Sequence, residues 1–282
     1  MIENIIKDIW LDLTIFDKLN LGFIGNVNKI TGLDAAYRIW EEANKTIENS
    51  DGNQEKLNQD FLSLKRAFNV TSKELKKNLG IDQIKYNGKK KKNDFLADLE
   101  YFEIIKTLNI SRYLKIRNMI EHENYNPPSK EECLYLSEYI WNYIRNATNV
   151  LMHFSEFLIF TPSNYHDECR VSFDYIIEEN KNTYYPHLYV KGFVDLNYIS
   201  FCYKENSMKI SNIQLLNKDD LEKLEEFNQS SAIINNLNKI PFRGEVLNQD
   251  AIANLIKYLI LPEYGGLDEY AFKTIFWNLS VY

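Results

Sequence analysis

Cysteine, glycine and proline are all scarce in this chain of 282 residues. Its three cysteines, Cys133, Cys169 and Cys202, are widely separated and odd in number. That pattern excludes a disulfide framework and a CxxC pair, and it is typical of a reducing compartment. The 10 glycines and 6 prolines exclude a collagen-like or low-complexity chain. What is present, 45% hydrophobic and 26% charged residues, has the proportions of a globular protein.

Long apolar runs are also absent. The longest, residues 150–160, is interrupted by His153 and Glu156, whereas a membrane-spanning helix needs about 20 predominantly apolar residues. Residues 1–13 carry acidic side chains within their apolar run and have no basic region before it, so we expect no secretory signal peptide and a cytoplasmic protein. The formal net charge of −7 does not indicate a strongly basic nucleic-acid-binding protein, although it is compatible with a local basic patch.

Residues 33–160 have helical periodicity. Apolar residues recur three and four positions apart, as in the stripe formed by Ala36, Ile39, Trp40, Ala43 and Ile47. Pro127-Pro128 must end one helix, and Ser129 followed by Glu132 matches a capping box that opens the next long one. We therefore predict an all-α bundle of four or five helices as a first domain, residues 1–162.

After Pro162 the chain changes to short segments rich in β-branched and aromatic residues, separated by Asn and Gly turns. These segments predict antiparallel strands joined by hairpins, and helical spacing returns at 218–237 and 249–261. We predict a second, smaller α+β domain over 163–282, and hence an α+β protein overall. The segment before Leu33 is ambiguous.

The stretch that carries most chemistry is LKIRNMIEHENYNPPS. In it the polar Asn118 follows Arg117, and four residues separate Arg117 from His122. Arginine offers a fixed charge and a planar fork for phosphate. Histidine, with an ordinary pKa of about 6.5, transfers protons near neutrality. Together these side chains meet the needs of RNA cleavage by the neighbouring 2′-hydroxyl, in which one group takes a proton, the other stabilises phosphoryl charge, and no metal is required.

This motif and its helical setting over residues 33–160 resemble the HEPN superfamily (higher eukaryotes and prokaryotes nucleotide-binding). Its members typically carry an Arg, a polar residue, three to five others and then a His, in a bundle of four or five helices. The resemblance implies metal-independent endoribonuclease activity, often as a toxin or in defence against phage, with Arg117 and His122 as the catalytic pair and Asn118 as a polar helper. It also implies a homodimer through the helical domain that places two motifs in one cleft, with an antitoxin or other regulatory partner.

Simpler interpretations remain open at each of these residues. Arg117 could pair with Glu121 on the same helix, and His122 could interact with a helix C-terminus. The whole bundle could then belong to a non-catalytic protein that dimerises and binds partners. Among other charged side chains, the run Lys89, Lys90, Lys91 and Lys92 could contact RNA phosphates or form a solvated loop.

Acidic side chains and potential metal ligands complete the candidates. Asp98, Glu100 and Glu103 could orient the catalytic pair, although a solvent-facing acidic stripe is the simpler interpretation. The segment from His166 to Cys169 has no second ligand pair at a standard spacing, so we expect no metal and no cofactor.

The predicted C-terminal domain offers no persuasive catalyst of its own. Tyr184, Tyr185 and Tyr189 lie in predicted strands, where packing is favoured over base stacking. The acidic and aromatic composition does not favour a generic phosphate-binding role. We expect this domain to sense a trigger or to position RNA rather than to hold a second active site.

Overall fold

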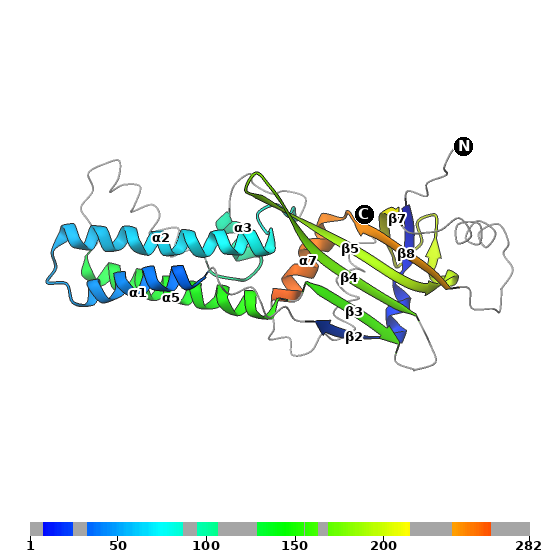
Figure 1. The fold of residues 1–282 in the computed structure, drawn as a ribbon, viewed down its shortest axis with the longest axis horizontal. Coiled ribbons are helices and arrows are strands. Elements are labelled where there is room, and N and C mark those ends of the chain that lie inside the picture. Colours follow the sequence, from blue (N-terminus) through cyan, green and yellow to red (C-terminus); the bar gives the residue numbers. More distant parts are fainter. Residues whose placement is uncertain are drawn as a thin grey trace.

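The structure is a computed structural model that describes residues 8–24, 33–86, 95–106, 129–154, 156–162, 169–214 and 239–260. These residues form an elongated molecule with long helices at one end and an antiparallel sheet at the other (Figure 1). The predicted α+β class is therefore confirmed.

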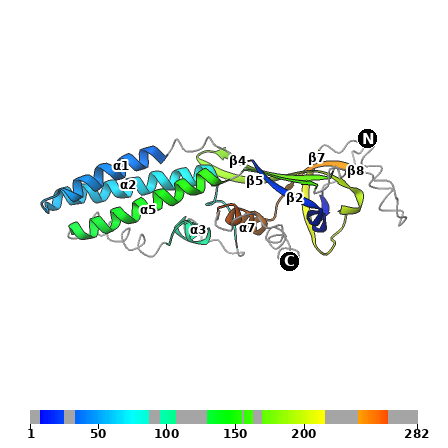
Figure 2. The same ribbon diagram turned by 90° about the horizontal axis from the view of Figure 1, so that it is seen from below.

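Three long helices form the helical end: α1 (Leu33–Glu48), α2 (Gln54–Leu79) and α5 (Lys130–His153). They lie side by side along their length, with the short helix α3 (Phe95–Tyr101) and helix α7 (Gln249–Ile260) to one side (Figure 2). The predicted periodicity is confirmed, because the same apolar stripes are buried, including Ala36, Ala43, Ile47, Leu57, Leu64, Phe68, Leu136, Ile140 and Ile144. Burial of each large aliphatic or aromatic side chain stabilises the fold by about 1.5–3 kcal/mol relative to exposure.

The sheet contains eight strands within the described residues. In chain order they are β1 (Asp8–Asp12), β2 (Leu19–Ile24), β3 (Phe157–Pro162), β4 (Arg170–Asn180), β5 (Thr183–Asp195), β6 (Ile199–Ser200), β7 (Ser207–Gln214) and β8 (Lys239–Val246). Their spatial order is β2-β3-β4-β5-β8-β7-β1-β6, and each pairs antiparallel with its neighbours.

The two faces of the sheet differ in composition. Along β4, Val171, Phe173 and Tyr175 are buried, whereas the alternate positions are partly or fully exposed. The buried face packs against the 3-10 helix η1 (Leu13–Lys18), whose Phe16 ring meets the Phe160 ring edge-on, with 4.8 Å between their centres. On the opposite face, which we call the open face, the side chains of β3, β4, β5 and β8 form a shallow hollow.

The junction between helices and sheet is close. The Tyr175 hydroxyl donates a hydrogen bond to the Leu79 carbonyl oxygen at the end of α2 (2.5 Å). Gly80 ends α2 in the left-handed conformation with φ of 58°. A Cβ atom at Gly80 would lie 2.8 Å from the Tyr184 carbonyl oxygen, so glycine is required both by the backbone angle and by the approach of β5.

The predicted boundary at residue 162 needs correction, because strands β1, β2 and β3 all precede it and yet belong to the sheet. Residues 1–162 are thus not all-α. β1 pairs with β7, nearly 200 positions along the chain, which no local pattern reveals. β3, with the sequence FLIFTP, follows a long helix as an apolar run, and such runs do not distinguish strand from helix. The predicted helix at 249–261 is confirmed by α7, while 218–237 lies outside the described residues.

Candidate functional site

The predicted catalytic and RNA-contacting side chains lie outside the described residues. Arg117, Asn118 and His122 fall within 107–128, and Lys89–Lys92 fall within 87–94. The structure describes the chain again from Ser129, where helix α5 begins.

The first turn of α5 is fixed by two sets of hydrogen bonds. Ser129 is the N-cap: its hydroxyl accepts from the Glu132 backbone N–H at 3.2 Å, and the Glu132 carboxylate accepts from the Ser129 backbone N–H at 2.9 Å. The predicted capping box is therefore confirmed. The Lys130 ammonium donates to the carbonyl oxygens of Glu48 and Ser50, both at 2.9 Å, which ties α5 to the end of α1. The first turn of α5 is thus held at a defined place on the bundle.

A buried carboxyl group lies on α2 beside this turn. Asp60 is 7% exposed, and its Oδ2 atom has no hydrogen-bond partner among the described residues. Burial raises the pKa of Asp60. Cys133, in the first turn of α5, is also buried, and burial together with the nearby Asp60 charge raises the pKa of its thiol to about 12. The Cys133 thiol is therefore protonated at neutral pH and is unsuited to act as a nucleophile. Sequence reasoning missed Asp60, which sits within an ordinary amphipathic pattern.

The three acidic side chains near α3 have separate environments. Asp98 is 1% exposed and accepts a hydrogen bond from the Tyr86 hydroxyl at 3.1 Å. Glu103 forms an ion pair with Lys257 of α7 at 2.7 Å, and Glu100 is exposed. The interpretation of these residues as one solvent-facing stripe is therefore wrong for Asp98, which is buried where α3 packs.

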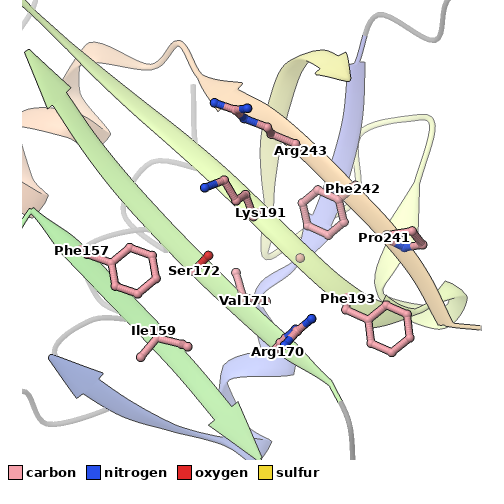
Figure 3. A pocket seen from close by; sticks show the side chains of 11 residues that line it. Phe157, Ile159, Arg170, Val171, Ser172, Lys191, Phe193, Pro241, Phe242 and Arg243 are labelled. Carbon is pink, nitrogen blue, oxygen red and sulfur yellow. The ribbon is translucent and has the colours of Figure 1, made fainter. Parts of the chain in front are cut away.

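The hollow on the open face is a candidate binding site. It has a volume of about 370 Å³ and is lined by strands β3, β4, β5 and β8 (Figure 3). Cross-strand pairing places one row of side chains over all four strands: Ile159, Ser172, Lys191 and Arg243. A second row, two positions further along the strands, consists of Arg170, Phe193 and Pro241. Paired residues share one face of a sheet, so these rows face solvent together.

Positive charge dominates the lining of the hollow. It includes Arg170, Lys191 and Arg243 and no acidic side chain. Lys191 forms an ion pair with Asp174 just outside it. The Arg243 guanidinium lies over the Tyr189 ring, 5.5 Å from its centre, and neither arginine forms an ion pair with a described residue. The overall acidic composition, which does not favour a generic phosphate-binding role, is thus not shared by the lining of the hollow.

The hollow is bordered by aromatic rings and by a charged cluster. Phe157 and Phe193 are partly exposed at its wall. The His187 ring is stacked on the Tyr189 ring, with 6.0 Å between their centres. Its Nδ1 atom lies 2.8 Å from the Glu245 carboxylate, and its Nε2 atom lies 3.6 Å from the Glu178 carboxylate. The predicted packing role holds for Tyr184, which is buried, whereas Tyr185 is exposed.

The cationic lining could not be predicted from the sequence, because its basic residues come from separate strands. Arg170, Lys191 and Arg243 are isolated basic residues in an acidic chain, and only the strand register brings them together. β4 and β5 each contain one Lys or Arg, so neither shows a basic pattern of its own, and the pairing of β5 with β8 could not be inferred locally.

Comparison of the chain with protein-family models, curated proteins and solved structures found no match. Within the described part of the chain, no group of three or more His, Cys, Asp or Glu side chains is arranged to hold a metal ion. None of the described helices combines the length and the apolar character needed to cross a membrane.

Proposed function

We propose that this protein is a metal-independent endoribonuclease of the HEPN type. The observation that carries the proposal is the motif Arg117-Asn118-x-x-x-His122, whose histidine lies seven positions before Ser129, the N-cap of helix α5. An arginine and a histidine at this separation supply the two groups that cleavage by an internal hydroxyl requires.

In the proposed reaction His122 takes the proton from a ribose 2′-hydroxyl, and the oxygen attacks the adjacent phosphorus. The new O2′–P bond forms as the bond from phosphorus to the 5′-oxygen breaks, and the leaving oxygen takes a proton from solvent. Arg117 stabilises the charge that develops on the phosphoryl oxygens, and Asn118 donates a hydrogen bond to them. The products are a 2′,3′-cyclic phosphate and a 5′-hydroxyl.

The described helices support this proposal in two ways. α1, α2 and α5 pack as parts of one bundle, as a HEPN-like fold requires. Ser129 and Lys130, the first described residues that follow the motif in sequence, are anchored to the bundle, and a fixed catalytic geometry would need such an anchor nearby. We extend the proposal to a cytoplasmic homodimer in which two motifs share a cleft, acting as a toxin or phage-defence effector under a regulatory partner, with Lys89–Lys92 at the rim of the RNA site.

The test is cleavage of single-stranded RNA by the purified full chain in EDTA. Replacement of a general acid–base group lowers the rate by about 10²–10⁴-fold, so His122→Ala should lose cleavage to that extent. Arg117→Ala should lose about 10²–10³-fold through weaker charge stabilisation. Mass spectrometry of the products should show 2′,3′-cyclic phosphate ends.

Two substitutions on α5 provide matched controls. His153→Ala and Arg145→Ala remove an exposed histidine and an exposed arginine, and both should leave cleavage unchanged. Undiminished cleavage by a folded His122→Ala protein would contradict the proposal. So would the absence of RNA cleavage by the unaltered chain.

A further inference from the structure

We propose that the hollow on the open face binds single-stranded nucleic acid, with Arg170, Lys191 and Arg243 contacting phosphates and Phe193 stacking on a base. The choice of RNA as its ligand rests on the proposed function, whereas the binding itself follows from the described residues. The surface consists of residues of the sheet and includes none of the proposed catalytic side chains.

Basic side chains crowd the hollow without enough acidic partners among the described residues. Lys191 and Arg243 stand directly opposite each other on β5 and β8, and like charges in that position destabilise a sheet. Asp174 compensates Lys191, but no described carboxylate pairs with Arg243 or Arg170. A bound polyanion would provide the missing compensation.

The spacing of the cations matches an extended chain of phosphates. Arg170 and Lys191 lie on neighbouring strands and in adjacent rows. Strands lie about 4.8 Å apart, and rows two residues apart along a strand are separated by about 7 Å. That separation is close to the distance between successive phosphates in an extended strand. A chain of phosphates can therefore meet Arg170 and then the Lys191 and Arg243 row.

The aromatic border of the hollow favours a nucleic acid over an acidic peptide as its ligand. Phe193 lies directly beside Arg170 on the neighbouring strand, so a flat apolar face stands next to a guanidinium that pairs with no described carboxylate. Proteins that bind single strands combine cationic grooves with rings on which bases stack. A duplex keeps its bases stacked on one another and would leave the Phe193 ring unused.

The test is fluorescence anisotropy with a labelled 12-nucleotide 2′-O-methyl uridine strand and the full chain. This probe has no free 2′-hydroxyl to attack, so its binding is measured whether or not the protein cleaves RNA. The double variant Arg170→Ala/Arg243→Ala should bind at least tenfold more weakly. Its plot of log affinity against log salt should be flatter by about 1.4, because each lost phosphate contact to a single strand removes about 0.7 from the slope.

Phe193→Leu separates stacking from general electrostatics. It preserves apolar volume, so the fold is retained, but it should weaken binding about fivefold or more, since one base–ring stack contributes about 1–3 kcal/mol. Lys209→Ala, which removes an exposed cation from β7 of the same sheet, is the control and should bind like the unaltered chain.

Several outcomes would overturn the proposal. One is equal affinity of the double variant and the unaltered chain. Another is a loss of affinity in Lys209→Ala as large as that in the double variant. A third is tighter binding of a polyglutamate peptide that is insensitive to Phe193→Leu, which would assign the surface to an acidic protein partner. Because the probe cannot be cleaved, these binding results can be interpreted even if the ribonuclease assay shows no cleavage.

Discussion

Asp60 is a residue at which burial and charge conflict. Burial holds the pKa of its carboxyl above the ordinary value of 3.8, so the ionised form is less stable in the folded chain than in the unfolded one. The folded protein therefore loses stability as the pH rises from the Asp60 pKa of the unfolded chain through the higher Asp60 pKa of the folded chain. We expect Asp60→Asn to raise the melting temperature at pH 7, with the gain shrinking toward zero as pH falls below about 4.

The measurement is thermal unfolding followed by circular dichroism over a series of pH values. Glu138→Gln removes a carboxylate that is exposed on α5 and should change the melting temperature little at any pH. If Asp60→Asn instead destabilised the protein at pH 7, the ionised carboxylate would have to be making a favourable interaction in the folded chain.

Single residues also show how far a candidate site can be predicted. Arg117 and His122 were found because they are close in sequence and match a chemical requirement. The lining of the hollow was not found, since Arg170, Lys191 and Arg243 become neighbours only through the register of β4, β5 and β8. Asp60 was missed for a different reason: a single carboxylate on an amphipathic helix is most often exposed, and its burial depends on packing against α5.

At the level of elements, the capping box of α5 is the feature most directly tied to the proposed catalytic segment. Loss of an N-cap side chain costs about 0.5–2 kcal/mol, so Ser129→Ala should lower the unfolding free energy by that amount in urea denaturation. Ser63→Ala is a matched control, because the Ser63 hydroxyl only donates back to the Gln59 carbonyl oxygen within α2. Alanine favours that helix interior, so the control should be neutral or slightly stabilising. Equal losses in both variants would show that the cap does not hold the start of α5.

The elements also differ in how well they could be predicted. α1, α2 and α5 follow from a 3.6-residue periodicity that each segment carries within itself. β4 and β5 follow from alternation around the turn at Lys181-Asn182, where both residues have positive φ. β1 and β3 could not be predicted in the same way, because five or six residues hold too little pattern and their partners are remote.

At the scale of the whole molecule, the sheet is assembled from both halves of the chain. β3 pairs with β4 and β1 pairs with β7, so cutting after residue 162 separates strands that are neighbours in the sheet. The fragment 1–162 alone would expose unpaired strand edges and the apolar side chains Ile9, Leu11 and Phe160, all of which are buried in the intact protein. Exposed edges of this kind promote aggregation. We therefore expect 1–162 to be insoluble when it is produced alone.

Co-expression of 1–162 with 163–282 tests this arrangement directly. The two fragments should co-purify as a soluble complex, because association restores the β3–β4 and β1–β7 pairings and reburies the shared apolar face. Affinity purification through a tag on one fragment, followed by circular dichroism, gives the readout, and the intact chain is the reference for strand content. The β4 substitution Phe173→Asp should abolish co-purification, since Phe173 is 1% exposed and lies against Phe160 and Phe16 from the other fragment. Soluble, cooperatively folded halves that do not associate would show instead that the helical and strand-rich parts fold independently, with the boundary at residue 162 that the sequence alone predicts.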